Sequence, residues 1–166
     1  ILLVCVGGCK TPLDVNPPPG FELGGIWDLA VFESDAAPDS KEIRDQEDRD
    51  VVAGIQRNVK ASSAFVEHDF PVISAVQMVI EQNDDSMGIE YSNGQYRDVS
   101  WGERDRDFWL VRSGWKEGNL VIESQRDLIK GVETMSLQRG GRRLRVDVFV
   151  QTGGRDVRVT RVFDRR

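Results

Sequence analysis

Residues 143–151 read RLRVDVFVQ, and their alternation predicts a β-strand with one buried face. The apolar positions are Leu144, Val146, Val148 and Val150. The positions between them carry charged side chains at Arg143, Arg145 and Asp147. A register shift of one residue would turn these charges toward the core, so the aliphatic face must point inward.

Turn residues divide the neighbouring sequence into similar short runs. Asn-Gly and Gly-Gly pairs supply the positive φ angles that tight hairpins require. Together with a first strand at Gly25–Phe32, these runs predict a mainly β fold. We expect an antiparallel up-and-down meander of about eight or nine strands that closes into a barrel. The later strands are expected near 75–82, 86–92, 95–101, 107–116, 119–127, 132–139, 142–151 and 155–163. The breaks between them are Asn83-Asp84-Asp85, Asn93-Gly94, Glu117-Gly118-Asn119, Gly140-Gly141 and Gly153-Gly154.

One helix is expected between the first and second strands. Asp39 is suited to the N-cap, and Glu42 stands three residues later, as in a capping box. Apolar residues then recur every four positions at Val51, Ile55 and Val59. The helix should begin within residues 40–48 and end near residue 62. We expect this stripe to pack on the barrel, with the acidic flank of the helix facing arginines of the later strands.

Composition and charge narrow the class of protein. The chain has 166 residues and 39% hydrophobic content, enough for a single domain with one core. Its net charge of −6 argues against a nucleic-acid partner. The charge is uneven, because residues 1–96 carry −11 and residues 97–166 carry +5. The two halves should therefore attract each other.

The first nine residues, ILLVCVGGC, are apolar and end in small residues before a cysteine. Val6, Gly7, Gly8 and Cys9 resemble the lipobox of bacterial envelope lipoproteins. That resemblance implies a signal remnant at 1–8, a lipid on Cys9 and a Pro-rich tether within 9–20. The folded domain would then be 21–166. Lys10 after the cysteine suggests an outer membrane location, facing the periplasm, with the membrane as a partner through the lipid.

Gly25-Ile26-Trp27 resembles the G-x-W motif that opens lipocalin-like barrels of the calycin type. With the closing residues 160–165, it is similar to a set of bacterial lipocalin-like lipoproteins. The resemblance implies that the glycine turns the chain into the barrel. Trp27 would close the narrow end against an arginine of the last strand. Arg161 is the first candidate and Arg158 the second.

The barrel interior is the expected binding site for a small apolar molecule or lipid. The candidate pocket residues are Trp27, Phe108, Leu110, Arg112 and Arg161. The alternative is a structural or protein-interaction lipoprotein with a filled barrel, which docks an envelope protein partner. Strand alternation does not separate the two, because a barrel of eight strands can hold side chains or one small ligand.

Catalytic and metal-binding patterns are few. His68 has acidic neighbours at Glu67 and Asp69, but three consecutive residues cannot surround an ion, so a surface histidine is expected. The sequence contains no Gly-x-Ser-x-Gly elbow, zinc spacing or phosphate-binding glycine loop. We therefore expect a protein that is not an enzyme and uses no cofactor or metal.

Overall fold

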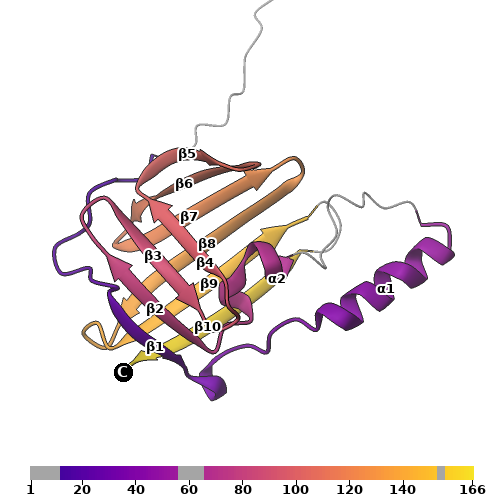
Figure 1. Ribbon diagram of the computed structural model, residues 1–166, viewed down its shortest axis with the longest axis horizontal. Helices are drawn as coiled ribbons and strands as arrows, with labels where there is room; N and C mark the ends of the chain where they lie inside the picture. The colour runs from indigo at the N-terminus through magenta and orange to yellow at the C-terminus, as the bar shows by residue number, and fades with distance from the viewer. Residues whose placement is uncertain (1–11, 56–65, 153–155) are drawn as a thin grey trace, which may run out of the picture.

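The computed structural model describes residues 12–55, 66–152 and 156–166. Within them, ten antiparallel strands form one sheet that curves into a nearly closed barrel (Figure 1). The order across the sheet is β4-β3-β2-β1-β10-β9-β8-β7-β6-β5. The predicted mainly β antiparallel barrel is therefore confirmed. The strands are β1 (Gly25–Leu29), β2 (Gln77–Gln82), β3 (Ser86–Tyr91), β4 (Tyr96–Ser100), β5 (Gly102–Arg106), β6 (Trp109–Lys116), β7 (Asn119–Arg126), β8 (Ile129–Gln138), β9 (Arg143–Gln151) and β10 (Val157–Arg165).

The expected count of eight or nine strands is wrong, because the sheet has ten strands and β5 was not expected. Its sequence, GERDR, has no apolar side chain, so hydrophobic alternation could not reveal it. The hairpin turns before β6 and after β7 also explain why the observed bounds of the neighbouring strands differ from the expected ones. Asp107 and Asp127 adopt φ values of 52° and 50°, which aspartate tolerates better than most residues. The first strand is shorter than expected, because Val31–Glu33 form a 3-10 turn, η1.

In the described part of the chain between β1 and β2, two α-helices occur, α1 (Ser40–Val52) and α2 (Val66–Asp69). Asp39 caps α1 and accepts hydrogen bonds from the backbone N–H groups of Lys41 and Glu42. The prediction that the helix packs on the barrel is wrong, because Val51 and Ile55 are 61% and 51% exposed. Figure 1 shows α1 beside the barrel and apart from its strands. Val59 lies outside the described residues.

The inward face of β9 is the one that its alternation predicts. Leu144, Val146 and Val150 are fully buried, and Val148 is nearly so. The same register carries across the sheet, since Val146 pairs with Met135 of β8 and with Arg161 of β10. Side chains from all parts of the sheet thus form one core inside the barrel.

Residues 12–24 lie against one end of the barrel. Asp14 exchanges backbone hydrogen bonds of 3.0 and 2.7 Å with Trp115. Phe21 packs edge-on against the Trp115 ring at 5.9 Å, and Leu23 is fully buried. The described part of the expected tether is therefore not a free spacer, because it covers this end of the barrel.

Trp27 is completely buried at the same end, as predicted. Its indole N–H donates to the carbonyl of Leu23 at 2.7 Å. The arginine over its ring belongs to the last strand, but it is Arg165, at 4.4 Å, and not Arg161 or Arg158. Arg158 instead lies over Phe149. Two-residue periodicity could not choose among arginines on one strand, because the choice depends on where β1 pairs along β10.

The barrel is completed by side chains between β4 and β5, which are the two edges of the sheet. Arg104 of β5 donates to the carbonyl of Asp98 at 2.6 Å and to its carboxylate at 3.0 Å. Ser113 of β6 donates to the carbonyl of Ser100. These contacts satisfy carbonyls on the edge of β4 that no strand pairs.

Candidate ligand-binding site

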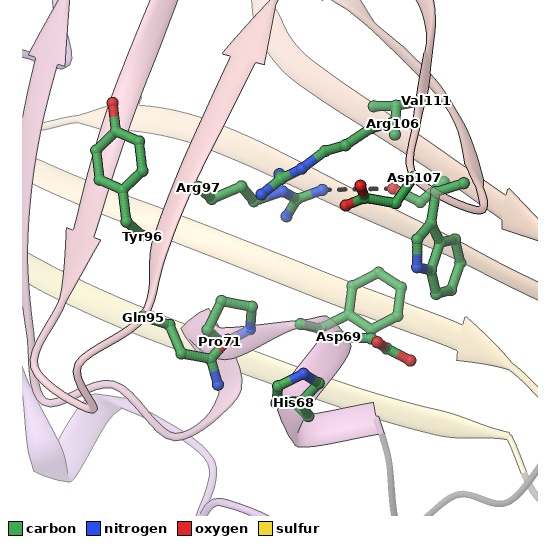
Figure 2. Close-up of a pocket in the computed structure, with 12 residues that line it drawn as sticks. His68, Asp69, Pro71, Gln95, Tyr96, Arg97, Arg106, Asp107 and Val111 are labelled. Carbon is green, nitrogen blue, oxygen red and sulfur yellow. Dashed lines mark hydrogen bonds between the residues drawn. The ribbon is translucent and has the colours of Figure 1, made fainter.

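A cavity of about 310 Å³ opens beside the β4–β5 edge, beneath α2 (Figure 2). Four segments distant in sequence contribute to it: α2 with the following Phe70 and Pro71, the β3–β4 turn with the start of β4, the β5–β6 hairpin, and β7. Its polar lining includes Arg97, Arg106 and Ser124. Its aromatic lining includes Phe70 and Trp109. The site therefore combines apolar walls with a few polar groups, as ligand sites usually do.

Arg97 is buried on the inward face of β4 and forms an ion pair with the fully buried Glu133 of β8. It also donates to Ser124 Oγ at 3.3 Å. Burial alone would lower the pKa of Arg97, but the Glu133 carboxylate raises it above its usual value. The guanidinium is thus held charged at the inner end of the cavity.

Two buried polar atoms beside Arg97 have no hydrogen-bond partner, Tyr91 Oη and Glu133 Oε1. Tyr91 is 2% exposed, and burial raises the pKa of its phenol well above the usual value, so it stays protonated. A buried polar atom without a partner costs about 1–3 kcal/mol. The cluster thus retains donor and acceptor capacity that the described side chains do not use.

Arg106 enters the cavity from the end of β5 (Figure 2). Its one hydrogen bond among the described residues goes to the carbonyl of Asp98, at 3.4 Å. Burial lowers the pKa of Arg106, and the neighbouring Arg97 and Arg104 lower it further. Arg106 is therefore a partly desolvated cation that faces other cations.

The short helix α2 forms one wall of the cavity and is tied to the barrel. Asp69 pairs with Arg126 of β7 at 3.3 Å, and Arg126 lies over the Trp109 ring at 4.6 Å. Phe70 packs edge-on against Trp109 with ring centroids 5.8 Å apart. The Phe70 ring also lies so close to Gly131 of β8 that a Cβ there would overlap it. Glycine at 131 therefore allows the aromatic wall to approach the strand.

The five residues expected to line a pocket do not come together. Trp27 lies at the opposite, closed end, and Phe108 is 83% exposed in the β5–β6 turn. Leu110 and Arg112 alternate with the inward Val111, so they face outward, and Arg112 pairs there with Glu123 at 3.0 Å. The sequence alone does not indicate which face of β6 points inward, because β6 carries large apolar side chains on both faces.

Arg161 is buried but does not line this cavity. It donates to the carbonyls of Asp35 at 2.6 Å and Ala75 at 3.1 Å. These bonds join β10 to the segments before and after the helices. Its role in the structure is therefore to hold loop backbone, which strand alternation alone does not reveal.

Sequence reasoning missed the residues of the cavity itself, above all Arg97, Arg106 and Trp109. Arg97 lies two residues before Val99 and so shares its inward face of β4, which is a usable signal for an inward arginine. His68, expected at the surface, is exposed at the cavity rim. Within residues 12–55, 66–152 and 156–166, no group of His, Cys, Asp and Glu could hold a metal ion. Cys9, the expected lipid attachment residue, lies outside the described residues, and no described helix is long and apolar enough to span a membrane.

Solved structures share this fold at low sequence identity. A luciferase domain from the dinoflagellate Lingulodinium polyedrum has a TM-score of 0.56 and 12% identity, covering 95% of this chain and 46% of its own. The chain thus spans about half the length of that protein. Fatty-acid-binding protein 1 from Echinococcus granulosus has a TM-score of 0.52 and 12% identity, covering 86% of this chain and 96% of its own. The likeness establishes a calycin-like barrel fold. No protein-family model and no curated protein matches the sequence.

Proposed function

We propose that this protein binds a small, largely apolar molecule inside the barrel, in the cavity beneath α2. The observation that carries the proposal is the juxtaposition of the Phe70 and Trp109 rings with the buried Arg97 cluster around a cavity of about 310 Å³. That volume lies at the small end of the range for ligand sites. The fatty-acid-binding protein of the same fold lends support, since its name states a ligand of this general class.

The role proposed is binding without catalysis. Two ionisable side chains of the cavity are already engaged in structural pairs, Arg97 with Glu133 and Asp69 with Arg126. His68 is exposed at the rim, and among the described residues no hydrogen bond joins its side chain to a nucleophile or to an orienting acid. A general base needs hydrogen-bond reach to the group that it deprotonates.

Occupancy of the cavity can be tested with the apolar dye Nile red and a variant that fills the site. Val111→Phe adds a ring at a buried position in the cavity wall and should reduce dye affinity at least tenfold. Val132→Phe is the matched control, because Val132 faces outward on β8. Equal dye binding by both variants would show that the dye lies elsewhere. Native mass spectrometry would reveal a molecule that co-purifies.

A persistently ligand-free mass together with no dye binding would favour the alternative role, a filled barrel that serves in structure or protein interaction. One observation is in keeping with that role. The helix α1 stands apart from the barrel and exposes Val51 and Val52, and Ile55 just after it is exposed as well.

We further propose that the barrel is attached to a bacterial envelope membrane through lipid on Cys9, without a spanning helix. The support is the motif Val6-Gly7-Gly8-Cys9. Multiple acyl chains would anchor the protein stably, whereas a single chain binds only marginally. In a Gram-negative host, Cys9→Ala should move the protein from the membrane to the soluble fraction, and Cys5→Ala should not. Retention of the Cys9→Ala protein on membranes after a high-salt wash would refute the anchor.

A further inference from the structure

We propose that the cavity selects small acidic molecules, aromatic or short-chain carboxylates, whose acid group binds between Arg106 and Arg97. The inference rests on the proposed function and names the ligand class of the same site. It is carried by the charges around the cavity, by the unpartnered polar atoms and by the space that is left.

The cations around the cavity differ in whether a carboxylate forms an ion pair with them. Glu133 neutralises Arg97, Asp98 pairs with Arg104, and Asp69 pairs with Arg126. Arg106 forms no ion pair with a carboxylate in the described parts of the chain. Asp107, which follows it directly, lines the cavity and attracts Arg106 electrostatically, but it is exposed in the hairpin turn and forms no ion pair with Arg106.

An acidic ligand would give Arg106 the close carboxylate partner that it lacks among the described residues. Figure 2 shows Arg97 and Arg106 reaching into the cavity from different strands, with their guanidinium groups directed toward one another. Burial lowers the pKa of Arg106, and repulsion by Arg97 and Arg104 lowers it further, in agreement with the closeness of the two guanidinium groups. Guanidinium groups bind carboxylates through paired, charge-assisted hydrogen bonds. A carboxylate between these two side chains would accept from both.

The buried phenol of Tyr91 is a further donor beside Arg97, although Tyr91 itself does not line the cavity. It is 2% exposed and interacts electrostatically with Arg97 and Arg106. Because its pKa is raised, the phenol keeps its proton and can donate to an anion. A hydrogen bond to a charged acceptor contributes more than one to a neutral group.

The space limits the ligand to a short molecule. Beyond Arg97, the barrel is occupied by fully buried apolar side chains, namely Met78, Met87, Ile89, Leu120, Ile122 and Met135. The remaining cavity of about 310 Å³ holds roughly ten water volumes, at about 30 Å³ each. Phe70 and Trp109 stand at its wall and suit a ring. A long straight chain would need this core to reopen.

The test compares three probes on the full chain by isothermal titration calorimetry: 4-phenylbutanoate, its neutral amide, and hexadecanoate. We expect the short acid to bind at least tenfold more tightly than the amide and more tightly than hexadecanoate. Arg106→Gln should remove most of the preference for the acid. Arg112→Gln, an arginine on the outward face of β6, should retain it.

The outcomes separate the two proposals. Equal affinity for acid and amide would overturn the acidic ligand class and leave the proposed binding function standing. Tighter binding of hexadecanoate would overturn the size limit. If neither the probes nor Nile red binds, the proposed function fails as well. Circular dichroism of both variants establishes that Arg106→Gln remains folded.

Discussion

The two ends of the barrel are built from similar residues and have different properties. Trp109 and Trp115 begin and nearly end β6 on the same inward face, so strand geometry places them roughly 20 Å apart. At the closed end, Trp115 meets Phe21, and Arg165 covers Trp27 while it donates to the carbonyl of Gly24 at 2.8 Å. At the open end, Trp109 meets Phe70 beside Arg97 and Arg106.

The difference lies in what the arginines face. Arg165 meets an indole ring and neutral backbone carbonyls, which seal the end without adding a second charge. Arg97 and Arg106 meet one another around a cavity, and only Arg97 has a carboxylate partner. An aromatic residue with an arginine can therefore close a barrel or form part of a binding site. The surrounding acceptors decide which.

The largest contrast is expected between tryptophans. Trp27→Ala removes a fully buried indole and should lower the free energy of unfolding by about 3–5 kcal/mol. Trp109→Ala removes a partly exposed ring and should lower it by less than half as much. Urea denaturation followed by circular dichroism measures both. Equal losses would show that the two ends are equally important for stability.

A second contrast concerns glycines that side chains cover. Gly131→Ala would place a Cβ inside the Phe70 ring, whose surroundings are buried, so we expect a loss of about 1–3 kcal/mol. Gly88→Ala would meet Tyr96 Oη, but Tyr96 is 65% exposed and can turn away. Its variant should melt close to the parent temperature. Similar losses would indicate that Phe70 is not held against Gly131.

The arginine over Trp27 gives a smaller effect. Arg165→Lys keeps the charge but loses the planar group, and should cost about 1 kcal/mol. Arg158→Lys is the control, because exposed Arg158 lies over Phe149 on the outer face. It should change the unfolding free energy by less than half of that amount. A reversed order would argue against Arg165 as the sealing residue.

The smallest contrast is in pH dependence. A hydrogen bond from Arg143 lowers the pKa of Asp164 near the closed end. The contribution of the Asp164 carboxylate to stability is therefore present above pH 3.8 and is lost as the pH falls through the lowered pKa. Burial raises the pKa of Asp69 at the open end despite Arg126, so stability falls as the pH rises above 3.8.

The corresponding asparagine variants should show effects of opposite sign. Asp164→Asn should be destabilised at pH 7, by less than about 1 kcal/mol because the carboxyl is half exposed. Asp69→Asn should be unchanged or slightly stabilised at pH 7. Both differences should shrink below pH 3.8. Melting temperatures between pH 3 and 8 measure them, and effects of the same sign would contradict the assignment.

The parts of the fold that follow a simple periodicity were predictable from sequence. The aliphatic face of β9 and the burial of Trp27 belong to this class, because an error there would bury charge or expose an indole. The strand β5 does not, since its inward arginines bridge an edge that only the closed sheet creates. The helix stripe at Val51 and Ile55 shows that amphipathic spacing does not guarantee a packing partner.

The cavity was beyond sequence reasoning for a related reason. Its wall residues come from segments that are far apart along the chain, and their convergence depends on how the strands are paired. The outward placement of Leu110 and Arg112 depends on the pairing of Val111 with Ser124. Periodicity predicts alternation, whereas register decides which set faces inward when both sets contain apolar residues.

The pairing of β1 with β10 has a consequence for rearranging the gene. Because β4 and β5 are unpaired edges, a new chain start at Gly102 would interrupt no strand ladder. Arg166 donates its backbone N–H to Ile26 at 2.9 Å, so the C-terminus lies near the start of β1. A circular permutant that begins at Gly102 and joins Arg166 to Glu22 through a short linker would then run through the sheet strand by strand, from one edge to the other.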